Sequence, residues 1–126
     1  LDFQRREHEI ETDFGYPMYA EGFRRAIEYA SGFGVPIEVT ENGVADASDS
    51  LRPEHLMRHI WILSEAIKDG YDVKSFHYWS LMDNFEWAEG YSMRFGLYEV
   101  NYGNQTRSLR QSGEIYRDLI ESQVKR

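Results

Sequence analysis

The chain has 126 residues, of which 41% are hydrophobic and 29% are charged, a balance typical of folded globular proteins. Its net charge of -8, without a run of Lys and Arg, argues against nucleic acid and anionic membranes as partners. It has no apolar run of the ~18–20 residues that span a bilayer, and no cysteine for a disulfide or a thiolate metal site.

The first regular element expected along the chain is a helix over residues 20–31. Phe23, Ile27 and Ala30 recur at spacings of four and three, with charged residues between them. Gly32 and the glycine two residues later favour the end of this helix. A short strand rich in β-branched residues then follows over residues 35–41.

The second helix is expected to open at Pro53, where the missing N–H costs nothing, and to close at Gly70. Its apolar stripe consists of Leu56, Ile60, Leu63 and Ile67. A second strand follows over residues 73–79, and then a long aromatic loop over about 80–100. The end of this loop, residues 97–102, has the pattern of a short extra strand, and a last helix is expected over residues 108–122.

This order of elements predicts parallel strands joined by a helical, right-handed crossover. Ligands bind at the carboxyl ends of the strands in such sheets, and Glu41 and Trp79 both lie at carboxyl ends. Two parallel strands make a poor sheet by themselves, because both edges stay open and both faces need cover. A closed barrel needs eight strands and about 250 residues, so this chain supplies about a quarter of one.

The stretch over residues 37–43, Ile-Glu-Val-Thr-Glu-Asn-Gly, has the pattern of a strand that delivers one carboxylate to its end and then turns sharply. That carboxylate, Glu41, is a candidate nucleophile or general base. A turn with an exposed acid is the simpler alternative, and this short motif alone does not exclude it.

A second stretch, residues 79–97, places many rings on what should be a loop. Pyranose rings present C–H faces that pack on indole, while their hydroxyls need fixed polar partners. Glu86 beside Trp87 offers both, since a carboxylate accepts from two hydroxyls and an indole N–H donates to another. The segment therefore favours sugar binding over the alternative of an aromatic plug. Its rings are Trp79, Phe85, Trp87, Tyr91 and Phe95.

Residues 39–43 and 79–97 together resemble the C-terminal part of a family-one glycoside hydrolase, a β-glucosidase or β-glycosidase. The resemblance covers about residues 13–119, and the second stretch is its more specific part. It implies an α/β fold in which the two strands are the seventh and eighth of a (β/α)8 TIM barrel. Residues 1–126 would then be the C-terminal segment of that barrel domain, incomplete as a single chain.

The resemblance also implies roles for five side chains. Glu41 matches the nucleophile of a retaining enzyme, and Trp79 matches the platform under the glycone sugar. Glu86 matches the residue that holds two sugar hydroxyls, Trp87 the neighbouring indole donor, and Phe95 a ring that lines the pocket. Family enzymes that act on phosphorylated sugars lack the acid at the Glu86 position, so unphosphorylated β-glycosides are the expected ligands. No metal or organic cofactor is implied.

One part of the family's machinery is absent from the chain. Retaining hydrolysis needs two carboxylates about 5–5.5 Å apart, and the family's acid/base lies in an Asn-Glu-Pro motif that this sequence lacks. Pairing Glu41 with Glu86 as nucleophile and acid is disfavoured, because the resemblance assigns Glu86 to substrate binding. We therefore expect the isolated chain to be inactive.

Two other functions stay open. The chain would act as a non-catalytic half-barrel module that associates with itself or with a missing N-terminal barrel segment, or as a weak sugar-binding domain. The N-terminus lacks the apolar core of a signal peptide, so a cytoplasmic location is expected.

The histidines and the remaining charged residues have simpler interpretations. His55 and His59 lie one turn apart, and a solvated helix face is favoured over a metal site. His77 lines the pocket or is a hydrogen-bonded core residue. Glu38 needs a basic partner unless its strand is less covered than in a complete barrel. Three further residues are expected to brace the aromatic loop or pair within it: Asp83, Asn84 and Arg94.

Overall fold

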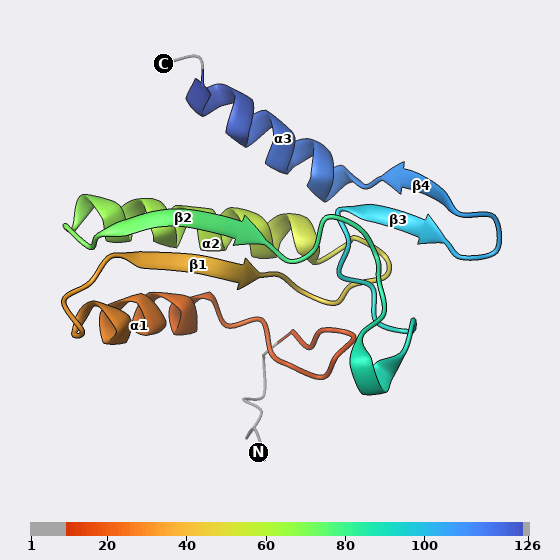
Figure 1. Ribbon diagram of the computed structural model, residues 1–126, viewed down its shortest axis with the longest axis horizontal. Coiled ribbons are helices and arrows are strands. Elements are labelled where there is room, and N and C mark those ends of the chain that lie inside the picture. Colours follow the sequence, from red (N-terminus) through yellow and green to blue (C-terminus); the bar gives the residue numbers. More distant parts are fainter. Residues whose placement is uncertain (1–9, 125–126) are drawn as a thin grey trace.

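The computed structural model describes residues 10–124, which form three α-helices, a 3-10 turn and two small sheets (Figure 1). The elements in chain order are α1 (Ala20–Ser31), β1 (Ile37–Asn42), α2 (Arg52–Lys68), β2 (Val73–Tyr78), η1 (Trp87–Glu89), β3 (Tyr98–Asn101), β4 (Thr106–Leu109) and α3 (Gln111–Val124). The expected alternation of helices and strands is confirmed, and α1 has the predicted bounds.

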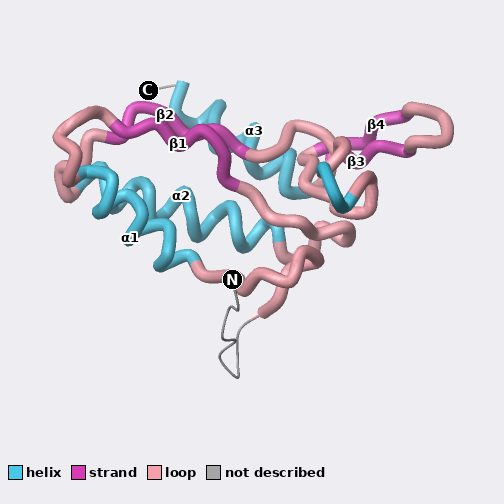
Figure 2. The backbone as a smooth tube through the Cα atoms, turned by 60° about the horizontal axis from the view of Figure 1, so that its bottom comes forward, coloured by secondary structure: helices cyan, strands magenta, loops and turns pink. Residues whose placement is uncertain are grey.

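The main sheet consists of β1 and β2, which pair in parallel with α2 as the crossover. Figure 2 shows α1 and α2 on the same side of this sheet. The Phe76 ring of β2 contacts Phe23 of α1 at 6.3 Å and Tyr116 of α3 at 6.4 Å between centroids. Because one ring meets both outer helices, α1 and α3 flank α2 over a single face, where Ile27 and Leu56 are buried.

The opposite face of the sheet has no cover among residues 10–124. The side chains that alternate with the helix-facing Val39 and Phe76 are exposed there: Glu38, Thr40 and His77. No further described strand pairs with the outer edge of β1 or of β2. The interpretation of Glu38 on a less covered strand therefore holds, and that of His77 as a core histidine is wrong.

The end of the chain differs from the expectation. The predicted extra strand exists as β3, but it pairs antiparallel with β4 (Thr106–Leu109), so α3 starts at Gln111 rather than at residue 108. The Asn101 side chain accepts hydrogen bonds from the backbone N–H groups of Gly103 and Asn104, which closes the connecting turn. Local turn chemistry thus outweighs the helical pattern of residues 108–110.

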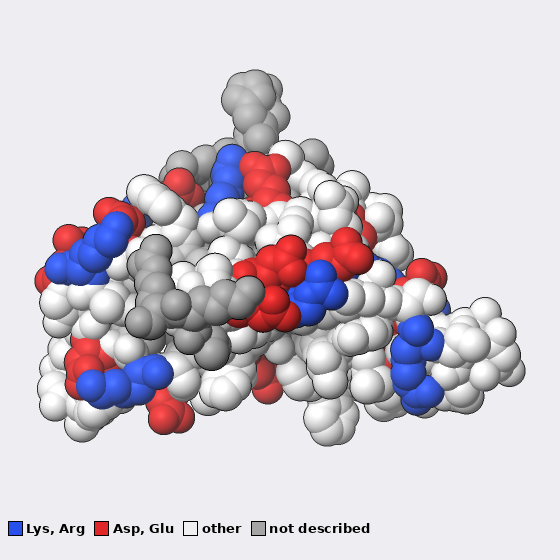
Figure 3. Space-filling view, turned by 90° about the horizontal axis from the view of Figure 1, so that it is seen from above, with Lys and Arg blue, Asp and Glu red and all other residues white. Residues whose placement is uncertain are grey.

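The surface is charged without a continuous basic area on the face seen in Figure 3. There, Lys and Arg side chains lie singly or beside acids, separated by neutral side chains. This matches the net charge of -8. Within residues 10–124, no helix has the length and apolar character needed to cross a membrane.

Candidate active site

A β-bulge near the end of β1 sets the direction of Glu41. Val39 pairs with Phe76 and Asn42 with Tyr78, so β1 advances three residues where β2 advances two. The alternation of side chains breaks at this point, and Thr40 and Glu41 are exposed in succession. Since a bulge re-aims side chains, the Glu41 carboxylate faces solvent at the carboxyl end of the strand instead of following Val39 toward the helices.

The two residues after Glu41 lie directly against Trp79. The Trp79 N–H donates to the carbonyl oxygen of Asn42 at 3.0 Å. A Cβ atom on Gly43 would lie only 1.7 Å from the Trp79 carbonyl oxygen. Glycine is therefore required here by a close backbone approach. The Trp79–Ser80 peptide bond is cis. The structure thus brings the predicted nucleophile segment and the predicted sugar platform together.

Replacing Gly43 with Ala is expected to lower the free energy of unfolding by at least about 2 kcal/mol. The added methyl group is fixed directly on Cα and overlaps the Trp79 carbonyl, a backbone group that cannot rotate away. Urea denaturation followed by tryptophan fluorescence measures the change. Gly103→Ala is the matched control, because its Cβ meets only the Asn101 side chain, at 3.2 Å. Equal effects of the two substitutions would contradict the close approach.

The aromatic loop carries the other predicted binding residues. Ser80 N–H donates to the carbonyl of Phe95 at 3.2 Å, and the Phe95 ring lies 6.1 Å from that of Phe14. Glu86 is half-buried next to η1, whereas Trp87, within η1, is 83% exposed. Phe95 is thus close to the Trp79–Ser80 backbone, whereas η1, the short coil that contains Trp87, lies apart from the end of β2 (Figure 1). Since Phe85 and Tyr91 are also exposed, these rings seal no core formed by the described residues.

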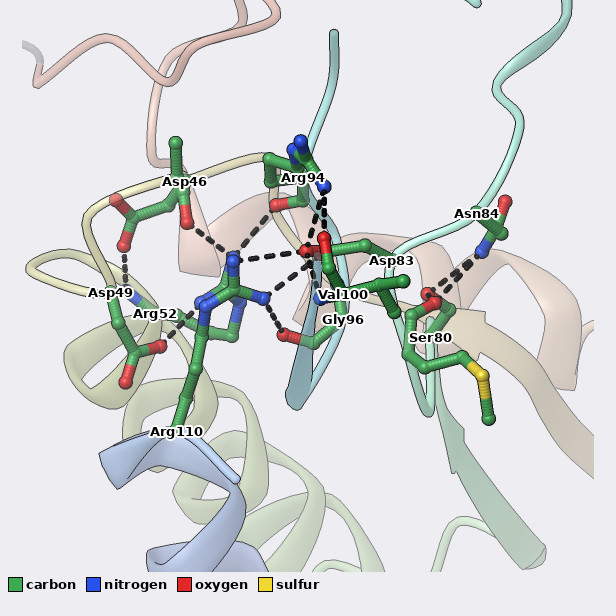
Figure 4. Close-up of polar contacts among 12 residues, drawn as sticks. Asp46, Asp49, Arg52, Ser80, Asp83, Asn84, Arg94, Gly96, Val100 and Arg110 are labelled. Carbon is green, nitrogen blue, oxygen red and sulfur yellow. Dashed lines mark hydrogen bonds and ion pairs between the residues drawn. The ribbon is translucent and has the colours of Figure 1, made fainter. Parts of the chain in front are cut away.

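A buried carboxylate, Asp83, holds this loop in shape (Figure 4). It accepts from the backbone N–H of Gly96 at 2.9 Å and of Val100 at 3.2 Å, and from both terminal nitrogens of Arg110 at 2.9 and 3.1 Å. Burial by itself would raise the pKa of Asp83, but the hydrogen bonds from Arg110, Gly96 and Val100 outweigh it and hold the pKa below its usual value. The predicted bracing role of Asp83 is confirmed.

Arg94 completes this network from inside the loop. Its Nη1 lies 3.3 Å from Asp83 Oδ2 and 3.1 Å from the carbonyl oxygen of Val100. Its guanidinium also lies over the Tyr102 ring, 4.5 Å from the centroid. The prediction that Arg94 pairs with a nearby acid is confirmed.

A second buried network, which the sequence interpretation missed, fixes the loop after β1. Asp46 accepts from the backbone N–H groups of Leu51 and Arg52 at 2.8 and 2.9 Å, as a cap for the start of α2. Arg52 is fully buried and donates to the carbonyl of Arg94 at 2.7 Å. Asp49 accepts from Ser112 at the start of α3. These contacts connect the Glu41 loop to the aromatic loop.

Residues 2–125 match the family model described as "Glycosyl hydrolase family 1". The chain belongs to glycosyl hydrolase family 1. It is 47% identical over 110 residues to the β-galactosidase of Pyrococcus woesei, a match that covers 86% of this chain and 22% of that protein. It is 37% identical over 121 residues to the β-glucosidase of an Agrobacterium species, a match that covers 88% of this chain and 26% of that protein.

Solved structures agree with this assignment. The β-glycosidase of Pyrococcus horikoshii superposes with a TM-score of 0.87 and 40% identity, over 91% of this chain and 27% of that one. The β-glucosidase of Thermotoga maritima in complex with cyclophellitol superposes with a TM-score of 0.90 and 33% identity, over 95% and 30%. The described residues are thus a small α/β part of a family 1 TIM barrel, and the chain spans about a quarter of the length of its curated relatives.

Behind the candidate site of this family 1 chain, α2 carries a histidine pair. His59 is buried and His55 half-buried, with ring centroids 3.9 Å apart, so the prediction of a solvated helix face is wrong. The pKa of His55 is lowered to about 3, mainly by burial and to a smaller extent by the neighbouring charges of His59 and Arg52. Burial also lowers the pKa of His59. Among residues 10–124, no group of three or more His, Asp or Glu side chains is arranged to hold a metal ion.

The histidine pair predicts acid sensitivity in a defined window. In the unfolded chain His55 has its usual pKa of 6.5, whereas burial keeps it neutral in the folded chain down to about pH 3. Above pH 6.5 the imidazole is neutral in both states, and its contribution to the free energy of unfolding is constant. As the pH falls from 6.5 toward 3, protonation favours the unfolded chain, so the free energy of unfolding decreases. The loss should reach roughly 2 kcal/mol at pH 5. Urea denaturation at pH 7, 6 and 5 measures it. The His55→Gln variant should show a flatter profile, and an unchanged slope in that variant would contradict the assignment.

Proposed function

We propose that this chain supplies the nucleophile and the sugar-binding residues of a retaining β-glycosidase, with β1 and β2 as the seventh and eighth strands of its barrel. One observation carries the proposal. The bulge presents Glu41 at the carboxyl end of β1, and the next two residues are packed against Trp79. Carboxyl ends of parallel strands are where barrel enzymes place their chemistry.

In the proposed reaction, a Glu41 oxygen attacks the anomeric carbon while the bond to the aglycone oxygen breaks, and an acid protonates that oxygen. A glycosyl ester forms on Glu41, and water then cleaves it with overall retention of configuration. Trp79 would support the glycone ring, and Glu86 and Trp87 would bind its hydroxyls. Phe95 would line the pocket. The acid/base would come from residues outside this chain, about 5–5.5 Å from Glu41.

The uncovered face of the sheet supports the need for the rest of a barrel. Its exposed side chains include the charged Glu38, and within residues 10–124 no strand pairs with the outer edge of β1 or of β2. Such edges pair with further strands where these are available. The missing barrel segment is the occupant that the proposal requires, and self-association of the chain is the alternative.

A sugar-binding role without catalysis is the second candidate function. It is favoured by the exposure of Trp87 and Phe85 on the aromatic loop. This role predicts that the isolated chain binds glucose-like sugars at millimolar concentration and that Trp87→Ala removes the binding. Titration calorimetry on the two proteins distinguishes it from the catalytic role.

The isolated 126-residue chain is expected to show no hydrolysis of an aryl β-glucoside, because it lacks the acid/base. A reconstituted barrel, in which the complete chain replaces the matching quarter of the P. woesei β-galactosidase, should recover hydrolysis. NMR of the first-formed sugar should show the β-anomer, as retention requires. Hydrolysis by the isolated chain, or an α-anomer released first by the barrel, would contradict the proposal.

A further inference from the structure

His55 of α2 reaches the end of the strand that carries Glu41. Its Nε2 atom lies 3.3 Å from Oδ1 of Asn42, across thirteen residues of sequence. Both side chains are half-buried, so water competes only partly for the contact. Among residues 10–124, no other side-chain hydrogen bond joins α2 to β1, and this one falls on the residue next to Glu41.

Asn42 is the point at which the nucleophile strand is fixed. Its backbone carbonyl accepts from Trp79, it pairs with Tyr78, and it is the first residue paired after the bulge that exposes Glu41. A movement of Asn42 would therefore change two things together: the direction of Glu41 and its place relative to Trp79. The contact from α2 to Asn42 is made with the Asn42 side chain.

His55 is itself held firmly. Its ring lies against His59 at 3.9 Å, and His59 packs edge-on against Phe23 of α1 at 5.2 Å. Beside the pair lies a cavity of about 10 Å³, close to the size of one water molecule. It is lined by Met18, Tyr19, Ala20, His55, Arg58 and His59. The imidazole thus has little room to turn away from Asn42.

We propose that His55 is a positioning residue for the Glu41 carboxylate and acts through the side chain of Asn42. The inference rests on the proposed function, since positioning matters only if Glu41 reacts with substrate. In this arrangement His55, which is fixed on α2, restricts the movement of Asn42 and therefore of the bulge that carries Glu41. The ring of His59, which packs against Phe23, supports His55.

The test compares two replacements of His55 in the reconstituted barrel. His55→Phe keeps a flat ring of similar size without a polar atom, and it should lower kcat about tenfold with KM changed less than threefold, because small displacements of reacting groups are costly. His55→Gln places an amide where Nε2 stood and should restore kcat to within about threefold of the original. Met57→Leu, on the exposed side of α2, is the control and should leave both constants unchanged.

A role in folding alone gives a different pattern. It would lower the melting temperature in His55→Phe while leaving kcat unchanged well below that temperature, and this result would overturn the proposal. So would a His55→Gln variant as slow as His55→Phe.

A double-mutant cycle of His55→Phe with Asn42→Ala tests whether His55 acts on Glu41 through Asn42. If His55 acts through Asn42, the double variant should have the kcat of the slower single variant. Fold-losses that multiply would overturn the proposal. If the barrel shows no hydrolysis at all, the proposed function has failed. The melting temperatures of the same single and double variants of the full chain then test the hydrogen bond between His55 and Asn42. Non-additive shifts in melting temperature support this contact, and additive shifts refute it.

Discussion

Replacing Glu41 with Gln in the reconstituted barrel is expected to lower kcat by roughly 10⁴- to 10⁶-fold, the range for removal of a catalytic nucleophile. The amide has nearly the shape of the carboxylate but cannot form the glycosyl ester. Because Glu41 is exposed on the uncovered face, the substitution should leave the fold unchanged. Aryl β-glucoside turnover, measured with the melting temperature, separates loss of chemistry from loss of structure.

Two companion variants sharpen this test. Glu38→Gln changes an exposed carboxylate on the same strand, three residues earlier, and should retain turnover within about tenfold if only Glu41 attacks the sugar. Glu41→Ala with added azide should recover cleavage of an activated substrate, since the small anion enters the space of the lost carboxylate. A Glu41→Gln barrel that keeps more than a tenth of its turnover would contradict the assignment.

Replacing Asp83 with Asn is expected to cost about 3–5 kcal/mol of unfolding free energy, as for removal of one partner from a buried ion pair. The substitution keeps the shape but leaves Arg110, whose side chain is only 6% exposed, without its counter-charge. An amide N–H₂ would also face the backbone N–H of Gly96 or Val100, which donate to Asp83. Urea denaturation of the chain measures the loss.

Asp118→Asn is the matched control for Asp83→Asn. Asp118 also pairs with an arginine, Arg117, but both side chains are more than half exposed. Exposed pairs contribute about 0–1 kcal/mol, so this variant should be almost as stable as the original chain. If the two aspartates gave losses of similar size, the structural role assigned to the buried network would be wrong.

The sequence predicted those parts of the fold that depend on local patterns. The period of Phe23 and Ile27 defined α1, and the β-branched run before Glu41 located β1. The start of α3 was predicted three residues too early, because the hairpin of β3 and β4 depends on pairing between segments and on the side-chain contacts of Asn101. A helical pattern in one segment does not contain that information.

The candidate site shows the same division. Glu41, Trp79 and the aromatic loop were recognisable from residue types and order. The bulge, the contact of Gly43 with Trp79 and the buried Arg52 were not, since each depends on residues that are distant in sequence. The histidine pair was misjudged for the same reason: its spacing fits an exposed or a buried helix face equally, and only the packing against Phe23 decides.

Mass spectrometry of a trapped intermediate tests the central claim most directly. Incubating the reconstituted barrel with an activated 2-deoxy-2-fluoro-β-glucoside should stop turnover and add one fluoroglycosyl group per barrel. After digestion with pepsin, the added mass should lie on the peptide that contains Glu41. A label on Glu86 or on any other carboxylate of the chain, or continued turnover without a label, would contradict the account.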